Sequence, residues 1–346
     1  MGGRTPARYA SPVRIEWVRN SASSFVSLRY IYSRHFLSNG LPMNQKISGL
    51  IAAPHTPFTV DGKLNAEVVE KQAAHFQRTG VVGVFVGGTT GESMSLAHHE
   101  RLELIRRWSE IGNQFELTVI AHVGGNSLPE AQELASASEA AGADGIAACA
   151  PCFFRSSTIS NLVEFCGLIA GAAPGTGFYF YHIPSMTHVD LPMVPFLESA
   201  SKKIPTLAGL KFTHSDLCEE MECANFEDGR FDVLHGFDET LIGGLSAGVR
   251  GAVGSTYNYA APLYNQLISA FANGELETAR ELQRKSARMV RVIQQHGFMA
   301  ASKAIMSFFD IDCGPVRRPL DPMPADQIQS LRSDLEAIGF FEWVAN

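Results

Sequence analysis

The sequence has 346 residues, 45% of them hydrophobic and 18% charged, an ordinary globular composition that suffices for one large core. Its formal net charge of −7 gives no reason to expect a nucleic acid or an anionic membrane as a partner. The apolar runs stay well short of the roughly 20 residues that span a bilayer, so no membrane segment is expected.

The first 42 residues differ in composition from the rest of the chain. They contain six arginines, many serines and a single acid, Glu16, which is the composition of a transit peptide. A start site placed too far upstream is the alternative, because Met43 stands directly before the first predicted strand. We expect 1–42 to be a disordered or non-functional extension of a cytoplasmic protein.

From Met43 onwards, short apolar runs alternate with helical patterns. Several of the runs are continuously apolar, as in strands that are covered on both faces. Eight such strand–helix units predict an α/β fold, a (β/α)8 TIM barrel over 43–272. An open doubly wound sheet is the alternative, but the G-x-G-x-x-G fingerprint is missing. The predicted strands are Ser48–Ala53, Val81–Val86, Leu117–His122, Gly145–Ala150, Gly177–Tyr181, Leu207–Phe212, Phe231–His235 and Gly251–Gly254.

The helical segments carry recognisable ends. Asn65 stands where an N-cap is expected, and Gly80, Gly112 and Gly142 stand where C-cap glycines are expected. Three further helices after the eighth unit place 273–346 against the barrel flank, because their apolar stripes have to be buried. The predicted helices are Asn65–Thr79, His98–Ile111, Leu128–Ala141, 158–171, 192–200, 215–225, 239–247, 261–272, Leu276–Gln295, Ala300–Phe309 and Ala325–Ala337.

Lys211 ends a predicted buried strand, where burial disfavours its charged form and lowers its pKa. A neutral lysine attacks carbonyl groups and forms a Schiff base. A lysine that reaches solvent or pairs with Asp216 is the alternative. Tyr181 ends the preceding strand, as a proton-transfer group or as a packed aromatic. The glycine-rich segment 87–92 follows the second strand, and its backbone N–H groups and two hydroxyls predict a small anion site.

Five segments together resemble the N-acetylneuraminate lyase and dihydrodipicolinate synthase family of Schiff-base aldolases, from about Ile47 to Leu320. The position two residues after Pro184 is Met186, where the synthase branch has an arginine, so the chain resembles the lyase branch. The segments are Gly-Gly-Thr-Thr-Gly-Glu (87–92), Tyr-His-Ile-Pro (181–184), Gly-Leu-Lys-Phe-Thr (209–213), Gly-Phe-Asp-Glu (236–239) and Gly-Ala-Val-Gly-Ser-Thr-Tyr-Asn (251–258).

The resemblance implies a retro-aldol cleavage of N-acetylneuraminate to pyruvate and N-acetylmannosamine. Lys211 would form the Schiff base, Tyr181 would relay the proton, and Thr89 and Thr90 would hold the pyruvate carboxylate. The residues implied for the polyhydroxyl tail are Thr213, the Gly236 carbonyl, Asp238, Glu239 and Ser255. Asp238 and Glu239 have an alternative role at a helix N-terminus.

The chain departs from the family pattern at two places. Family members bring a tyrosine from a neighbouring subunit where this chain has Phe153 and Phe154, so an intersubunit proton relay is in doubt. His188 stands where a small residue is usual. We expect Glu92 to brace its loop, and His182, His214 and His235 to be wall residues.

We expect neither a cofactor nor a metal, and free thiols rather than disulfides for the six cysteines, because Cys149 and Cys152 lack the context of a redox or zinc motif. The resemblance implies a homotetramer. Two other functions stay open. The first is a related pyruvate-dependent aldolase acting on a 2-keto-3-deoxy sugar acid. The second is a sugar-acid sensor without catalysis.

Overall fold

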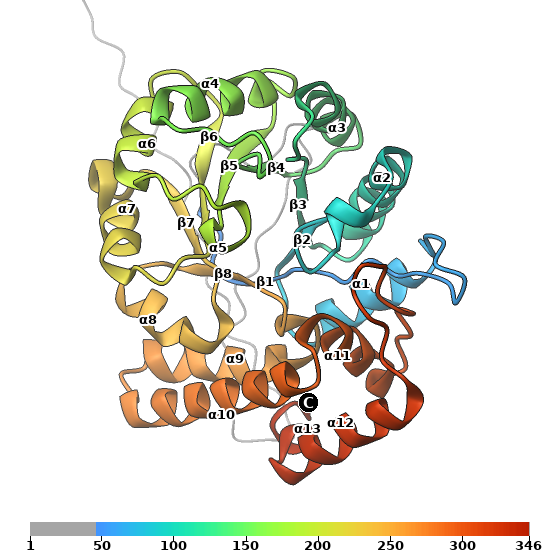
Figure 1. Cartoon of the computed structure of the whole chain (residues 1–346). Coiled ribbons are helices and arrows are strands. Elements are labelled where there is room, and N and C mark those ends of the chain that lie inside the picture. Colours follow the sequence, from blue (N-terminus) through green and yellow to red (C-terminus); the bar gives the residue numbers. More distant parts are fainter. Residues whose placement is uncertain (1–45, 346) are drawn as a thin grey trace, which may run out of the picture. The chain divides into compact units, whose positions relative to one another are not determined.

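Eight parallel strands close into a barrel in the computed structural model, which describes residues 46–345 (Figure 1). Each strand pairs with the next along the chain, and β8 pairs with β1, so no edge is left open. The (β/α)8 barrel predicted from the alternating pattern is therefore confirmed. The strands are β1 Gly49–Ala52, β2 Gly83–Val86, β3 Thr118–His122, β4 Gly145–Cys149, β5 Gly177–His182, β6 Leu207–Phe212, β7 Asp232–His235 and β8 Gly251–Gly254.

The strands are apolar on both faces because both faces are buried. Side chains of one parity, such as Phe85 and Ile120, fill the barrel interior, and those of the other parity pack against the helices outside. On β5 this alternation turns Tyr181 inward and Phe180 outward. The larger of the two apolar clusters therefore lies between the barrel and its helices.

Helices follow the strands and surround the barrel. The helices of the repeating units are α1 Val68–Arg78, α2 His98–Gln114, α3 Leu128–Ala140, α4 Ile159–Ala170, α6 Met193–Ala200, α7 Leu217–Gly229, α8 Leu241–Ser246 and α9 Tyr257–Ala272. Shorter turns precede some of them, namely η1 Ser93–Ser95, α5 Pro184–Thr187 and η2 Asp238–Thr240. The last helices are α10 Leu276–Gln295, α11 Phe298–Ile305, η3 Met306–Phe309, α12 Ala325–Ala337 and α13 Phe340–Trp343.

Two of the residues expected to cap helices do not cap them. Helix α2 does not stop at Gly112 but continues to Gln114. A Cβ atom at residue 112 would lie 2.3 Å from Cγ2 of Val119 on β3. Gly112 is thus a contact glycine between helix and strand. Asn65 is not the N-cap of α1, which begins at Val68 and has no side-chain cap. By contrast, Gly80 and Gly142 adopt positive φ angles just beyond their helices, as C-cap glycines do.

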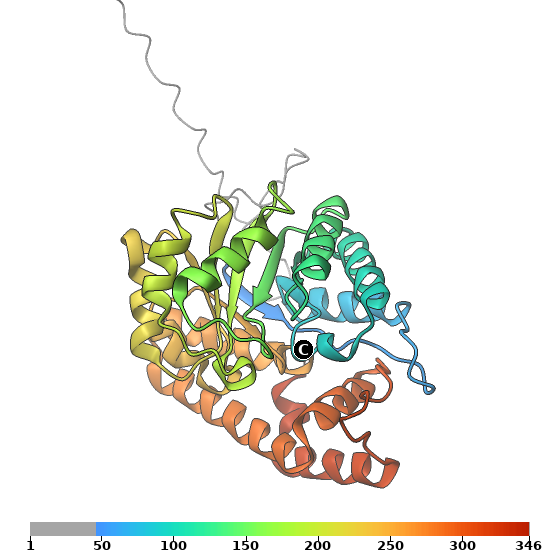
Figure 2. The same cartoon turned by 45° about the horizontal axis from the view of Figure 1, so that its top comes forward.

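The C-terminal helices lie together on one side of the barrel. Figures 1 and 2 show α10, α11 and α12 in orange and red, with α10 alongside α9. The domain boundary expected at residue 272 stays a prediction, and the extension expected over 1–42 lies outside the described residues. Among residues 46–345, no helix is both long and apolar enough to cross a membrane. All six cysteines are free, as expected.

Candidate active site

The carboxyl ends of β5 and β6 bring two predicted catalytic residues side by side. Tyr181 and Lys211 are direct partners in the parallel register of these strands, and both face the barrel interior. The Lys211 Nζ atom lies 4.1 Å from the centroid of the Tyr181 ring and 4.1 Å from that of Phe85 on β2. Lysine and tyrosine therefore meet in a mainly apolar pocket of the barrel.

Burial changes the chemistry of Lys211. Its side chain is almost fully buried, and this desolvation lowers its pKa to about 7, while Asp238 and Cys149 oppose the shift. A large part of the lysine is therefore a free amine at neutral pH, which is the nucleophilic form. Asp216 has a separate role, because its carboxylate caps α7 by accepting hydrogen bonds from the backbone N–H groups of Cys218 and Glu219.

Tyr181 stays a phenol rather than a phenolate. Burial raises its pKa to about 12, and a hydrogen bond with Thr89 opposes that shift. The Tyr181 hydroxyl and Thr89 Oγ1 lie 3.4 Å apart, so the tyrosine reaches the glycine-rich loop after β2. A proton on this hydroxyl can be passed between substrate and loop without the phenol becoming an anion.

The glycine-rich loop after β2 carries the hydroxyls of the predicted anion site. Thr90 is buried, and its hydroxyl lies 2.6 Å from that of Ser255, just after β8. The loop is tightly wound, since a Cβ atom on Gly91 would lie 3.1 Å from the Gly87 Cα atom. Thr89, Thr90 and Ser255 thus form a group of hydroxyls beside the lysine–tyrosine pair.

The residues predicted for the polyhydroxyl tail divide into two groups. Thr213 Oγ1 is buried and lies close enough to the Tyr181 hydroxyl to oppose the rise in the pKa of Tyr181, but it makes no well-aligned hydrogen bond among the described residues. Gly236 is a required glycine, because a Cβ atom there would clash with Thr213. Asp238 is already engaged, since its Oδ2 atom accepts hydrogen bonds from Thr256 N at 2.7 Å and Thr256 Oγ1 at 2.6 Å. Glu239, next to it, is half-buried.

Comparisons with known proteins agree with this geometry. The family model described as "Dihydrodipicolinate synthetase family" matches residues 46–338. The chain belongs to the dihydrodipicolinate synthetase family. The N-acetylneuraminate lyase of Gallus gallus is 39% identical over 298 residues, which cover 85% of this chain and 97% of that protein. That of Homo sapiens is 37% identical over 303 residues, which cover 86% and 95%.

Solved structures of the dihydrodipicolinate synthetase family superpose on the barrel. The Proteus mirabilis N-acetylneuraminate lyase matches with a TM-score of 0.83 and 41% identity, covering 86% of this chain and all of that one. The Aliivibrio salmonicida N-acetylneuraminate lyase (sialic acid aldolase) gives 0.83 and 41%, with coverages of 86% and 98%. The chain is therefore a family member of the lyase type, as the residue at 186 suggested.

His122 is a residue of this family member's site that sequence reasoning missed. It ends β3, and its ring stands edge-on to that of Tyr181, with centroids 5.8 Å apart. Its Nδ1 atom lies 2.9 Å from the Gly87 carbonyl oxygen, while its Nε2 atom is buried and has no hydrogen-bond partner within residues 46–345. Burial lowers its pKa to about 3, so the ring is neutral. The signal in the sequence was a histidine at the carboxyl end of a predicted strand, at a position where the side chain faces the barrel interior.

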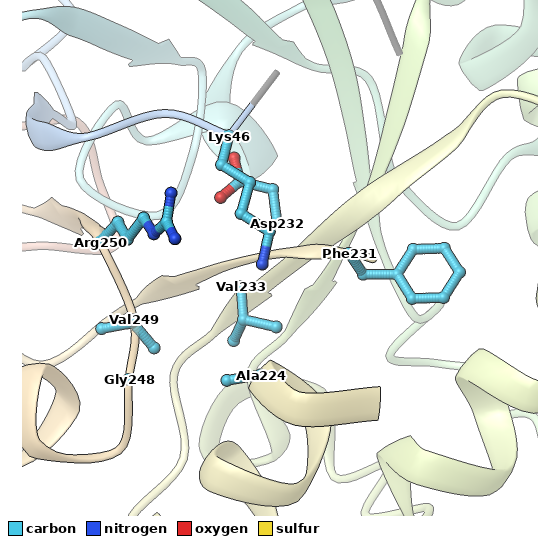
Figure 3. A pocket seen from close by; sticks show the side chains of 8 residues that line it. All are labelled: Lys46, Ala224, Phe231, Asp232, Val233, Gly248, Val249 and Arg250. Atoms are coloured by element: carbon cyan, nitrogen blue, oxygen red, sulfur yellow. The ribbon is translucent and has the colours of Figure 1, made fainter. Parts of the chain in front are cut away.

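The opposite end of the barrel contains a second, shallow pocket. Figure 3 shows Lys46 and Arg250 around the Asp232 carboxylate, with apolar side chains below. Asp232 accepts hydrogen bonds from the Ile47 N–H group and the Tyr179 hydroxyl, both at 3.1 Å. This carboxylate ties the chain before β1 to β5 and β7. Contacts at the amino ends of barrel strands serve stability, whereas the chemistry of a barrel enzyme takes place at the carboxyl ends.

A buried ion pair braces the glycine-rich loop from behind. Glu92 has a left-handed backbone (φ 54°), and its Oε1 atom accepts a hydrogen bond from Lys303 Nζ on α11 at 2.8 Å. Its Oε2 atom accepts one from the Arg317 backbone N–H, also at 2.8 Å. Both side chains of the ion pair are 1% exposed. Glu92 therefore connects the loop to the C-terminal helices, and bracing the loop is the role expected from the sequence.

Replacing Lys303 with methionine should destabilise the fold by about 3 kcal/mol, because it leaves the Glu92 carboxylate buried without its counter-ion. Urea unfolding followed by circular dichroism measures this. The double variant Lys303→Met with Glu92→Gln is the control, and we expect it to be less destabilised than the sum of the single changes. A loss below about 1 kcal/mol for Lys303→Met would show that the pair contributes little.

Proposed function

We propose that the protein is a Schiff-base aldolase that cleaves N-acetylneuraminate to pyruvate and N-acetylmannosamine. The observation that carries the proposal is the buried Lys211, whose pKa is lowered to about 7, in contact with the Tyr181 ring at the mouth of the barrel. The matches to relatives named N-acetylneuraminate lyase extend over nearly the whole length of those proteins, and they support the choice of substrate.

The reaction follows from the position of Lys211. Its free amine attacks the keto carbon of the open-chain sugar acid, and loss of water gives an iminium ion. The iminium accepts the electron pair of the bond between C3 and C4 when that bond breaks, which leaves an enamine on the lysine and releases the aldehyde. Protonation of the enamine and hydrolysis then return the free lysine and pyruvate.

Tyr181 is placed to move the proton that the cleavage releases. The hydroxyl at C4 has to lose its proton as the carbonyl of the aldehyde forms. Because burial holds the pKa of Tyr181 at about 12, we infer that it passes a proton on rather than ionises. Thr89 at 3.4 Å leads from Tyr181 toward the carboxylate-binding loop, which gives the proton a route.

The hydroxyl groups around the pair would bind the two ends of the substrate. We propose that Thr89 and Thr90 hold the pyruvate carboxylate with their hydroxyl and backbone N–H groups. Thr213, whose buried hydroxyl lies near that of Tyr181, is the strongest candidate for the sugar tail. The remaining tail-binding residues that we propose are the Gly236 carbonyl, Asp238, Glu239 and Ser255.

The test of this function is the release of pyruvate from N-acetylneuraminate by the purified protein. Release supports the lyase. If pyruvate is not released but borohydride traps it on the protein, the related aldolase acting on a 2-keto-3-deoxy sugar acid becomes the better reading, and a panel of aldehydes identifies its partner. If there is neither release nor trapping, a sugar-acid sensor fits better.

The pH dependence should reflect Lys211. Only its neutral form attacks the substrate, so kcat/KM should rise about tenfold per pH unit below pH 7 and level off above it. A steady-state pH profile with N-acetylneuraminate measures this. An ordinary lysine, with a pKa near 10.5, would shift the rise to about pH 10 and contradict the role that we assign to burial.

We also propose that the protein is a cytoplasmic homotetramer. Phe153 and Phe154 after β4 are 74% and 85% exposed, and such an apolar pair is suited to an interface. Light scattering should give four times the chain mass of 37.6 kDa. A monomeric mass would contradict the tetramer without touching the proposed chemistry.

A further inference from the structure

Three side chains outside the barrel interior come together at the ends of β5 and β6. His182 is the last residue of β5, His214 follows β6 by two residues, and Asp190 lies between α5 and α6. One ligand atom from each lies within 4.8 Å of the other two. Strand alternation turns His182, like Phe180, away from Lys211, and the ring of His214 packs against those of His182 and Phe212. This cluster is therefore separate from the site described above.

The two histidines of the cluster have nitrogen atoms without partners. His182 is 1% exposed, and its Nε2 atom is buried and makes no hydrogen bond among residues 46–345. The same holds for the Nδ1 atom of His214. The two rings stand edge to face with centroids 5.4 Å apart. Buried polar atoms in native proteins nearly always have a partner, so two unpaired nitrogens at one place indicate a missing ligand.

The charges around the cluster indicate that this ligand is a cation. Asp190 is exposed, and no hydrogen bond or ion pair is recorded for its carboxylate in the described part of the chain. Glu219 on α7 is close enough to interact electrostatically with Asp190, His214 and Asp216. Asp190 and Glu219 are thus the two carboxylates near these imidazoles, and their negative charge favours a positive ion.

We propose that His182, Asp190 and His214 bind a divalent transition-metal ion of the Zn²⁺ type. Two imidazole nitrogens and one carboxylate oxygen are a common ligand set for such ions. Ligand atoms in a tetrahedral zinc site lie roughly 3.3 Å apart, so ligand atoms that are now up to 4.8 Å apart have to close in by up to about 1.5 Å. The exposed Asp190 has the freedom to do this. Solvent fills the remaining coordination position on the exposed side.

The bound ion would join two loops that carry the proposed catalytic groups. His182 directly follows Tyr181, and His214 directly follows Thr213. A metal bound by all three side chains connects the end of β5, the segment before α6 and the segment after β6 to one another. It has no direct contact with the substrate and acts by positioning, so activity is not its primary readout.

The test is Zn²⁺ binding by the full-length protein after treatment with a chelator. Isothermal titration calorimetry should show one Zn²⁺ per chain for the wild type. The exchanges Asp190→Asn and His214→Gln should each weaken binding by at least about 10- to 100-fold, the loss that removal of even an outer-shell partner causes. Zn²⁺ should also raise the unfolding temperature of the wild type but not that of Asp190→Asn.

His188→Asn is the matched control, because it removes a nearby exposed imidazole and asparagine tolerates the left-handed backbone there (φ 54°). It should bind Zn²⁺ as the wild type does. Replacing Zn²⁺ with Co²⁺ excludes the exposed Cys218 as the site, since a thiolate ligand would add a strong charge-transfer absorption. No binding by the wild type, or unchanged binding by Asp190→Asn and His214→Gln, would overturn the proposal.

Discussion

Replacing Lys211 with methionine should lower kcat/KM for N-acetylneuraminate by at least about 10³-fold, the order of loss that follows removal of a nucleophile. Methionine has nearly the shape of lysine and lacks the amine, and it suits a pocket formed by Phe85 and Tyr181. Borohydride should trap pyruvate on the wild type and not on this variant. The measurement is pyruvate release, together with the mass of the protein after reduction.

The control for this variant is Lys203→Met, which removes an exposed lysine after α6. It should retain both activity and trapping. Because methionine relieves the desolvation of a buried amine, Lys211→Met should be at least as stable as the wild type. Pyruvate trapping that persists in Lys211→Met would place the Schiff base on another lysine and contradict the site as described.

Tyr181→Phe should lower kcat by about 10²- to 10⁴-fold, because it removes the group that passes the proton at C–C cleavage. The apolar contact with Lys211 Nζ is kept by the phenylalanine ring. Pyruvate forms a Schiff base with Lys211 without any C–C cleavage, so this step does not need the proton transfer by Tyr181. Borohydride trapping of pyruvate should therefore continue. Single-turnover kinetics separates the two steps.

Tyr179→Phe is the matched control for Tyr181→Phe. Tyr179 also faces the barrel interior, two residues earlier on β5, but its hydroxyl donates to Asp232 at the opposite end of the barrel. This change should cost stability, about 1 kcal/mol for the hydrogen bond, and leave kcat close to that of the wild type. Equal losses of kcat in the two variants would indicate a general effect on packing.

Much of the fold could be predicted from the sequence because strand and helix periods alternate clearly. All eight strands occur within one or two residues of their predicted bounds. The ends of helices were less certain, since the same residue type serves different purposes. Gly112 lies inside α2 because the helix packs against Val119, and no local pattern reveals a contact between residues of different elements. The short helix α5 was missed for lack of length.

Part of the candidate site could also be predicted from the sequence, because two of its residues lie near the ends of predicted strands. Tyr181 and Lys211 each stand one residue before the end of an apolar strand, and this position alone indicates a shared rim. His122 obeys the same rule but was missed, because its strand was read for its apolar residues only. The cluster of His182, Asp190 and His214 has no compact ligand spacing in the sequence, and only the pairing of β5 with β6 brings its members together.

The ion pair between Glu92 and Lys303 makes the glycine-rich loop of the proposed active site depend on the packing of the C-terminal helices. Because α11 holds the carboxylate of the glycine-rich loop, detachment of the C-terminal helices would release that loop while the barrel strands stay paired. On heating, the enzyme should then lose its activity at a lower temperature than the one at which the barrel strands unfold. The C-terminal helices would in this way set the upper working temperature of a catalytic centre to which they contribute no reacting atom.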